Sequence, residues 1–322
     1  MDIVWLLLGL GLILGGANWL TDGASAIARK WGVSDLIIGL TVVAFGTSTP
    51  ELSIGIISAL KGSAPLAVGN VVGSNIFNIF VIIGVVALIH PIKIEKSILN
   101  TQIPLVILSS VALLAIGCGP WLGVAGPSEI IRPEGILLFL FFLIFMRYTF
   151  SQAKSAAPDD PSAVQASSKP GMNMWKAVGL VILGLGALVV GGDRFVAGAS
   201  GIAKFLGMSE SLIGLTIVAA GSSLPELATS IIAATKGKTG IAVGNVIGSN
   251  IFNIFMVLGI TGTILPLPFG GIGVFDLLIM TFASLLFWVF GRSFGDKEID
   301  RWEGGILLAC YVAYIVAQIM VV

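Results

Sequence analysis

Two nearly identical stretches, GNVVGSNIFNIF at residues 69–80 and GNVIGSNIFNIF at residues 244–255, decide the fold of this 322-residue chain. A shift of 175 positions aligns residues 16–80 with residues 191–255 without a gap. Roughly 37 of the 65 aligned positions are identical, which is far above chance for unrelated segments. The chain therefore contains one structural unit that is used twice.

The composition excludes a water-soluble globular protein. Hydrophobic residues make up 56% of the chain, charged residues only 11%, and the mean hydropathy is +1.04; a soluble domain carries roughly 25% charged residues. A helix of roughly 20 apolar residues crosses the bilayer core of about 30 Å, and the chain holds about ten such runs. We therefore predict an all-α, polytopic membrane protein.

The apolar runs divide equally between the two copies of the repeat. We expect spans at about 3–21, 35–60, 65–90, 102–120 and 134–150, and again at 174–194, 210–235, 240–265, 271–290 and 304–321. An odd number of spans makes the second copy enter from the opposite face of the membrane. The sequence thus predicts ten transmembrane helices arranged as two inverted five-helix repeats, an architecture found in secondary transporters.

The predicted halves are residues 1–150 and 174–322, and their most similar parts cover about 35–90 and 210–265. Between them, residues 151–173 are rich in Ser, Ala and Pro and are predicted to form a flexible linker. The first apolar run follows the acidic Asp2 and no basic residue, so we expect a span and not a cleaved signal peptide.

Basic residues are distributed unequally between the two sets of loops. Most lie on the side of the predicted linker, and only Lys61, Arg132, Arg194 and Lys204 lie on the other side. Cytoplasmic loops carry the excess of Lys and Arg, so we expect a cytoplasmic linker and two extracellular termini in the plasma membrane. The 17 basic and 17 acidic residues balance, which gives no basic excess for binding nucleic acid.

Glu51 and Glu226 lie within the second and seventh predicted spans, in GTSTPEL and GSSLPEL. A carboxylate inside a spanning helix costs a few kcal/mol at the least, so it is retained where it faces a polar cavity or a partner. The pair is therefore a candidate site. The alternative is that both acids are protonated and only form hydrogen bonds between helices.

A proline precedes each acid. Pro50 and Pro225 lack the backbone N–H that would bond to a carbonyl about four residues earlier, so the carbonyls of residues 46–47 and 221–222 are expected to be free. The alternative is a kink without ligands. Small residues that would surround these oxygens are Ala44, Thr47, Ser48, Ala219, Ser222 and Ser223.

A polar stripe crosses the third and the eighth spans. Its members are spaced four residues apart, on one helical face; they are Asn70, Ser74 and Asn78, and Asn245, Ser249 and Asn253. Together with the acids they form a set of oxygen donors without His, Cys or Met, which suits Ca²⁺, Mg²⁺ or Na⁺ better than Zn²⁺ or copper. Mg²⁺ is disfavoured because it dehydrates reluctantly and prefers rigid octahedral sites. Two negative charges neutralise one Ca²⁺, two Na⁺ or two H⁺, so the same site could hold competing ions in turn.

GTSTPEL with GNVVGSNIFN, repeated as GSSLPEL with GNVIGSNIFN, resembles the paired repeats of the sodium/calcium exchangers. The resemblance covers essentially the whole chain. It implies that Glu51 and Glu226 ligate Ca²⁺ together with the carbonyls of Thr47 and Ser222. It also implies sodium ligands at Ala44, Thr47, Glu51, Ser74 and Asn78, and at Ala219, Ser222, Glu226, Ser249 and Asn253.

The chain departs from the family pattern at two positions. Asn253 stands where the family often has an acid, notably in potassium-dependent members, and Ser222 stands where Thr is common. The calcium/proton branch usually carries its acid in a GN-x-x-E pattern, so the position of the acids here favours sodium as the counter-ion.

The resemblance implies an antiporter that exchanges Na⁺ for Ca²⁺ by alternating access, with ions bound near the midplane between the repeats. We expect no enzyme activity, no cofactor and no obligatory protein partner beyond the bilayer. The alternatives are a Ca²⁺/H⁺ antiporter on the same scaffold, a passive cation channel and an intramembrane hydrolase that uses the paired acids.

Overall fold

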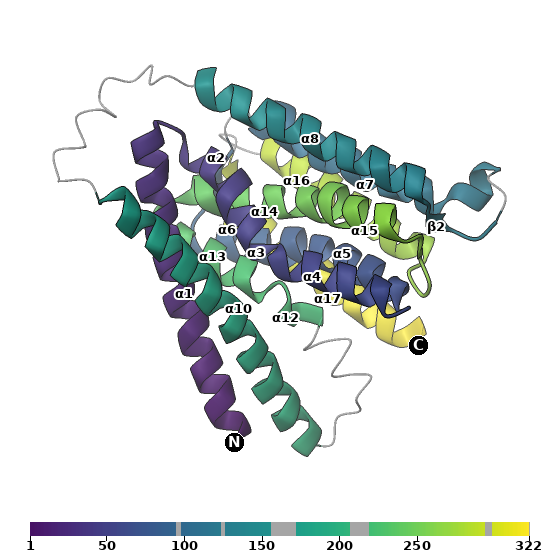
Figure 1. Cartoon of the computed structure of the whole chain (residues 1–322), viewed down its shortest axis with the longest axis horizontal. Coiled ribbons are helices and arrows are strands. Elements are labelled where there is room, and N and C mark those ends of the chain that lie inside the picture. The colour runs from purple at the N-terminus through teal and green to yellow at the C-terminus, as the bar shows by residue number, and fades with distance from the viewer. Residues whose placement is uncertain (95–97, 124–125, 156–171, 207–218, 294–297, 322) are drawn as a thin grey trace. The chain divides into compact units, whose positions relative to one another are not determined.

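The computed structural model (Figure 1) describes residues 1–94, 98–123, 126–155, 172–206, 219–293 and 298–321. Helices dominate this part of the chain. They are α1 (Asp2–Trp31), α2 (Asp35–Ile38), η1 (Gly39–Val43), α3 (Ala44–Thr47), α4 (Thr49–Leu60), α5 (Ala64–Phe77), η2 (Asn78–Ile83), α6 (Gly84–Ile89), η3 (Ile98–Gln102), α7 (Ile103–Gly117), η4 (Gly119–Leu122), α8 (Arg132–Ser155), α10 (Met174–Phe205), α12 (Ala219–Gly221), α13 (Leu224–Thr235), α14 (Thr239–Ile251), η6 (Phe252–Leu258), α15 (Gly259–Ile264), α16 (Val274–Ser293) and α17 (Arg301–Val321). Short strands are β1 (Ile92–Lys93), β2 (Glu129–Ile130), β3 (Leu267–Pro268) and β4 (Glu298–Ile299).

The predicted class, an all-helical membrane protein, is confirmed. Within the described ranges, eight helices are long and apolar enough to cross a membrane, and a ninth span results if the bent pair 35–47 and 49–60 is counted as one. The start of the predicted span 210–235 lies outside the described residues, which resume at Ala219, and α13 provides its second part.

The contacts divide the chain into two compact units. The first unit contains residues 1–47 and 145–248, and the second contains residues 48–144 and 249–322. Each unit therefore takes segments from both halves of the sequence. Most of the predicted linker, residues 156–171, lies outside the described part of the chain.

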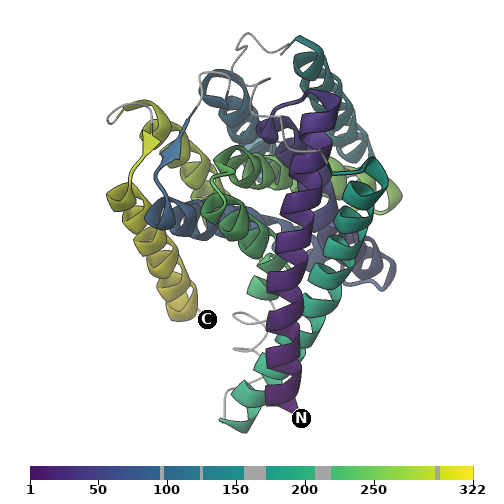
Figure 2. The ribbon, with the colours of Figure 1, turned by 90° about the vertical axis from the view of Figure 1, so that its left-hand side faces the viewer.

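In the first unit, α1 and α10 lie side by side along their length (Figures 1 and 2). Their backbones touch at glycines: a Cβ at Gly16 would lie 2.8 Å from the Gly184 carbonyl oxygen, and a Cβ at Gly184 would lie 2.8 Å from the Gly16 carbonyl oxygen. Small residues let helices approach this closely in membranes. The glycines of this contact recur every seven residues and are Gly9, Gly16 and Gly23 on α1 and Gly184, Gly191 and Gly198 on α10.

Both helices are longer than predicted. The expected end at residue 21 is wrong, because α1 continues to Trp31 and is terminated by Gly32 in the left-handed conformation (φ 66°). Likewise α10 continues past residue 194 to Phe205. Hydropathy falls before either helix ends, but the small and polar residues of the last turns of α1, among them Thr21 and Ser25, are buried and keep the helix packed.

In the second unit, α7 packs on α16, and α17 packs on α6. Two short antiparallel ladders accompany these pairs, with Ile92 opposite Ile299 and Ile130 opposite Leu267. The helices that follow β2 and β4 begin alike: the Glu134 carboxylate accepts a hydrogen bond from the Ile131 N–H at 2.9 Å. The Glu303 carboxylate accepts one from the Asp300 N–H at 2.7 Å. Such bonds satisfy backbone donors at a helix start.

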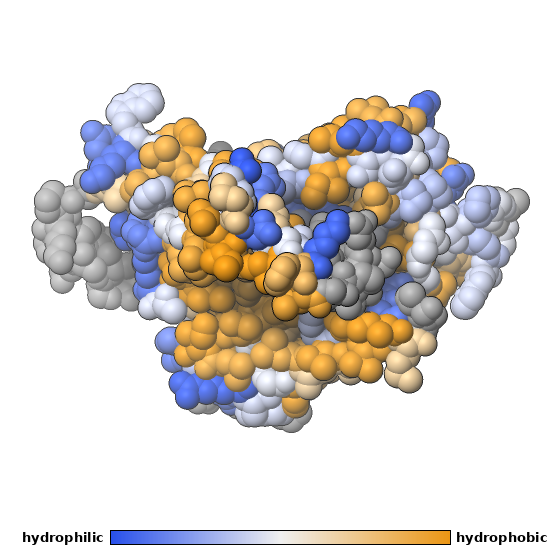
Figure 3. All heavy atoms as spheres, turned by 90° about the horizontal axis from the view of Figure 1, so that it is seen from below, coloured by the Kyte–Doolittle hydropathy of each residue, from blue (hydrophilic) through white to orange (hydrophobic). Residues whose placement is uncertain are grey.

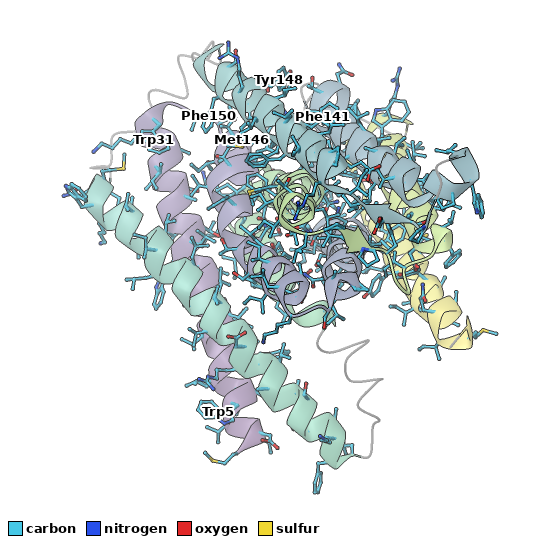
Figure 4. The ribbon with its side chains drawn as sticks, turned by 45° about the vertical axis from the view of Figure 1, so that its right-hand side comes forward. Trp5, Trp31, Phe141, Met146, Tyr148 and Phe150 are labelled. Carbon is cyan, nitrogen blue, oxygen red and sulfur yellow. The ribbon has the colours of Figure 1, made fainter. Side chains whose placement is uncertain are left out.

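The outer surface suits a bilayer. Much of the face in Figure 3 is hydrophobic, and many large apolar side chains, such as Leu7 and Ile182, are exposed. Trp5 and Trp31 lie near opposite ends of α1 (Figure 4), about 39 Å apart at the helical rise of 1.5 Å per residue. That separation approaches the total bilayer thickness of about 40–45 Å, and tryptophan is enriched at both membrane interfaces.

Candidate cation site

The predicted helix break before Glu51 is present. Helix α3 ends at Thr47, Ser48 has turn geometry (φ −87°, ψ 7°), and α4 begins at Thr49 with Pro50 in its first turn. Glu51 is the third residue of α4 and is 1% exposed. The break thus places a buried carboxylate at a helix N-terminus, where the partial positive charge of the helix favours an anion.

The second repeat reproduces this arrangement in the first unit. Helix α12 ends at Gly221, and α13 begins at Leu224 with Pro225 in its first turn. Glu226 is again the third residue of its helix and is 1% exposed. Ser222 lies half-buried in the turn between the helices, and Ala219 begins α12.

In the first unit, Asn245 connects Thr47 to the helix that carries Glu226. The fully buried Asn245 donates from Nδ2 to the Glu226 carbonyl oxygen at 3.3 Å and to Ser230 Oγ at 3.1 Å. Thr47 Oγ1 can donate to Asn245 Oδ1 at 3.1 Å, or to the Val43 carbonyl oxygen at 3.1 Å. Ala44, at the start of α3, is fully buried. The structure therefore brings together the oxygens of Thr47 and Asn245 and the backbone of Glu226.

In the second unit, four predicted residues are buried on two helical segments. Ser74 and Asn78 belong to α5 and η2, and Ser249 and Asn253 belong to α14 and η6. Each is at most 2% exposed. Asn70, by contrast, is half-buried, whereas its repeat counterpart Asn245 is fully buried.

Sequence reasoning missed two residues that connect these segments. Asn78 Nδ2 donates to Asn250 Oδ1 at 3.0 Å, and Asn253 Nδ2 donates to Asn75 Oδ1 at 3.0 Å. Asn75 Nδ2 donates to the Asn250 carbonyl oxygen at 3.2 Å, and Asn250 Nδ2 donates to the Asn75 carbonyl oxygen at 3.5 Å. Because Asn75 corresponds to Asn250 and Asn78 to Asn253 in the repeat, the first two bonds are equivalent to each other, and so are the last two. The signal was available, because both residues lie within the repeated GSNIFN.

The helices are also irregular where these amides lie. Asn78 begins the π-helical segment η2, and Asn253 lies in the π-helical segment η6. A π-helical turn contains an extra residue and occurs frequently at functional sites. The four-residue spacing of the polar residues predicted that they share one helical face, but it could not predict that the helix becomes a π-helix at this point.

The donor set fits hard cations. Within the described ranges, no group of three or more His, Cys, Asp or Glu side chains could hold a metal, so the oxygens come from two carboxylates, hydroxyls and amides. The buried Ser74 Oγ, Asn78 Oδ1 and Asn253 Oδ1 have no hydrogen-bond partner among the described residues. Ca²⁺ takes six to eight such oxygen ligands, and a buried, unpaired oxygen is costly unless something binds it.

Each repeat contains a buried acid at a broken membrane helix, together with hydroxyl and amide oxygens. This combination is typical of one class of protein, the cation transporters of the membrane. The chain belongs to the sodium/calcium exchanger family. The family model described as "Sodium/calcium exchanger protein" matches residues 1–151 and 176–320.

Individual relatives match over almost their whole length. The chain is 40% identical over 321 residues to "Putative antiporter CaxA" of Alkalimonas amylolytica, covering 97% of this chain and 96% of the relative. It is 35% identical over 345 residues to "Sodium/calcium exchanger MaX1" of Methanosarcina acetivorans, covering 98% of each. It also resembles the solved structure of the sodium-calcium exchanger NCX_Mj soaked with Na⁺ and Ca²⁺, with a TM-score of 0.83, 32% identity, and coverage of 98% of this chain and 97% of that one.

Proposed function

We propose that this protein is a secondary antiporter that exchanges Na⁺ for Ca²⁺ by alternating access. The observation that carries the proposal is the repeated arrangement of a helix break, a proline and a buried glutamate at Glu51 and Glu226. Two carboxylates balance the charge of one Ca²⁺ or of two Na⁺, so the same acids can hold either ion in turn. Membership of the exchanger family supports this choice of ions.

We propose that both glutamates ligate the transported ions, together with the carbonyls of Thr47 and Ser222 for Ca²⁺. For Na⁺ the additional ligands come from the same breaks and from the polar stripe. They are Ala44, Thr47, Ser74 and Asn78 in the first repeat, and Ala219, Ser222, Ser249 and Asn253 in the second. The burial of Ser74, Asn78 and Asn253, with oxygens that accept no hydrogen bond from described residues, supports this assignment.

We propose ten transmembrane helices in two inverted repeats. Reciprocal contacts inside the second unit support this arrangement. Asn75 and Asn250 bond to each other's backbone, and β1 pairs with β4 as β3 pairs with β2. Under the 175-residue shift, β1 at Ile92 corresponds to β3 at Leu267. In each ladder, therefore, a strand of one repeat pairs with a strand of the other repeat, as a two-fold relationship between the repeats requires.

We propose that both termini are extracellular and that the protein lies in the plasma membrane. Basic residues gather at one end of the first unit, where a cavity of about 260 Å³ is lined by Arg29, Lys236 and Lys238. There Lys236 pairs with Asp22 at 2.6 Å and Lys238 with Asp35 at 3.1 Å. An excess of Lys and Arg marks the cytoplasmic side, which leaves the N-terminus of α1 outside.

Transport measurements test the function directly. Purified protein in liposomes should take up ⁴⁵Ca²⁺ when loaded with Na⁺, at clamped pH and without K⁺. Uptake driven by a pH gradient alone would instead show a Ca²⁺/H⁺ antiporter. Uptake that needs no counter-ion on the opposite side would show a channel.

Charge removal tests the site. Glu51→Gln and Glu226→Gln should each abolish Ca²⁺ exchange while the protein remains folded, because one lost charge leaves the divalent ion undercompensated in a low-dielectric surrounding. The matched control is Asp22→Asn, which removes a carboxylate that is 46% exposed and paired with Lys236. Near-normal exchange by either glutamine variant would remove that residue from the site.

A further inference from the structure

Four asparagines of the second unit, Asn75, Asn78, Asn250 and Asn253, share a fixed pattern of donors and acceptors. We infer that Asn75 and Asn250 are positioning residues, which hold the amide oxygens of Asn253 and Asn78 ready for the transported cation. The inference rests on the proposed function, because it assigns these oxygens to ions. It concerns residues that would act through others and not as ligands themselves.

The orientation of Asn253 follows from a backbone carbonyl. The Asn75 amide lies 3.2 Å from the Asn250 carbonyl oxygen. A carbonyl only accepts, so the atom of Asn75 that faces it must be Nδ2. Asn75 Oδ1 is therefore the atom that faces Asn253 at 3.0 Å, and it must receive a hydrogen. Asn253 consequently presents its Nδ2 to Asn75 and turns its own Oδ1 away.

The same reasoning fixes Asn78 through Asn250. The Asn250 amide faces the Asn75 carbonyl oxygen at 3.5 Å with its Nδ2. Its Oδ1 then accepts from Asn78 Nδ2 at 3.0 Å. Neither orientation depends on the ion, because both are set by backbone carbonyls of α5 and α14.

In these orientations, the oxygens that face away from the asparagine cluster are Asn78 Oδ1 and Asn253 Oδ1, and these are the oxygens without a hydrogen-bond partner among the described residues. Asn78 and Asn253 are each 1% exposed, and the Oδ1 of each accepts no hydrogen bond from a described residue. Asn75 and Asn250 behave differently, because their Oδ1 atoms are occupied. A cluster that only held helices together would have no use for these two oxygens, and leaving a buried acceptor without a hydrogen bond is costly. A buried amide oxygen prepared in this way is a ligand for a hard cation.

Each positioning asparagine bonds to the ligand asparagine of the other repeat, and double-mutant cycles can test this pairing. Asn75 should act through Asn253 of the other repeat, and not through Asn78 of its own helix. Asn75→Ala should raise the Na⁺ concentration that half-saturates both transport and ion-induced thermal stabilisation by about tenfold, which corresponds to about 1.4 kcal/mol. Because Asn253→Ala already removes the oxygen, adding Asn75→Ala to it should change this concentration little. Combined with Asn78→Ala, the effect of Asn75→Ala should instead add fully.

A structural control separates positioning from stability. Ser110 and Ser284 form a buried hydrogen bond of 3.0 Å between α7 and α16 in the same unit. Ser110→Ala should lower the melting temperature without ions and leave the half-saturating Na⁺ concentration unchanged. If Asn75→Ala does not fold, Asn75→Ser, which also lacks the amide but keeps a polar group, enters the same cycles.

The outcomes distinguish the two proposals. If the wild type shows neither Na⁺-dependent Ca²⁺ flux nor stabilisation by Na⁺ or Ca²⁺, the proposed function is wrong and the positioning role falls with it. If the wild type shows both, the positioning role is overturned alone by either of two results. One is an unchanged half-saturating Na⁺ concentration in the Asn75 variant; the other is full additivity of the Asn75 and Asn253 substitutions.

Discussion

At the scale of single residues, Asn253 Nδ2 donates to Asn75 Oδ1 at 3.0 Å, so a carboxyl group introduced at position 253 would meet an acceptor. A carboxylate has no hydrogen to donate, so in Asn253→Asp the bond to Asn75 survives only while the new side chain is protonated. We expect the variant to transport like the wild type at low pH and to diverge as the pH rises. Initial rates of Na⁺-driven Ca²⁺ uptake between about pH 5 and pH 9 measure this difference.

The ionised form of the variant adds a negative charge that a second monovalent cation could balance, so K⁺ should stimulate the variant at high pH and leave the wild type unaffected. The matched control is Asn100→Asp, at an exposed asparagine in the same unit. Wild-type transport that requires K⁺, or a variant whose pH and K⁺ profiles overlay those of the wild type, would contradict this role of Asn253.

Sequence alone predicted the acids and the polar stripe, because a charged or amide side chain within an apolar run is conspicuous. It did not predict the partners of those residues. Asn75 and Asn250 are polar residues in the same repeated hexapeptide as Asn78 and Asn253. Their importance depends on contacts between segments about 175 residues apart, which helical spacing does not describe.

At the scale of elements, the break at Ser48 lies two residues before Pro50, whose missing N–H is the expected cause. Pro50→Ala would supply a donor for the Gly46 carbonyl oxygen and favour a continuous helix by up to about 3 kcal/mol. We expect Ca²⁺ exchange to fall strongly while the melting temperature stays the same or rises. The control is Pro133→Ala, because Pro133 is exposed in the first turn of α8, where a missing N–H costs nothing. Full exchange by Pro50→Ala would show that the break does not depend on proline.

The glycine contact between α1 and α10 allows a second test at this scale. Gly16→Ala and Gly184→Ala would each place a Cβ 2.8 Å from a backbone oxygen of the partner helix, which requires the helices to separate. We expect each to destabilise the protein by about 1–3 kcal/mol. In the same two helices, a Cβ at Gly11 or Gly186 meets nothing within 4 Å. Gly11→Ala and Gly186→Ala should be neutral, or stabilising by about 0.5–1 kcal/mol.

Thermal unfolding in detergent, with the four variants compared side by side, measures the difference. Equal effects at contact and open positions would show that the close approach of α1 and α10 is unimportant for stability. The sequence predicted neither the contact nor the full length of the two helices. Hydropathy marks where a helix leaves the apolar core, whereas α1 ends at Trp31 because the next residue, Gly32, takes the left-handed conformation.

At the scale of the whole molecule, the repeat was readable because 175 residues separate near-identical segments. The interleaving of the two halves was not readable. Each compact unit combines early and late segments, with boundaries between residues 47 and 48, between residues 144 and 145, and between residues 248 and 249. Such a division depends on long-range packing. Only the boundary between residues 47 and 48 coincides with a feature that the sequence predicts, the helix break at Ser48.

The charge moved in one transport cycle is a property of the whole molecule, and we predict that it is not zero. Each repeat offers more oxygens than a single Na⁺ would need, because buried hydroxyls and amides accompany each glutamate. If three Na⁺ exchange for one Ca²⁺, one net charge crosses per cycle. A potential of 100 mV then contributes about 2.3 kcal/mol, which corresponds to a change of roughly 50-fold in the equilibrium Ca²⁺ ratio.

Liposomes with a K⁺ gradient and valinomycin set the potential while Na⁺ and pH are held equal on both sides. An inside-positive potential should increase the equilibrium accumulation of ⁴⁵Ca²⁺, because Na⁺ leaving the lumen then carries net positive charge outward; an inside-negative potential should decrease it. The control is the same K⁺ gradient without valinomycin, which keeps the K⁺ concentrations but sets no potential. Accumulation that does not respond to valinomycin would indicate an electroneutral exchange of two Na⁺ for one Ca²⁺, in which the two glutamates alone balance every load.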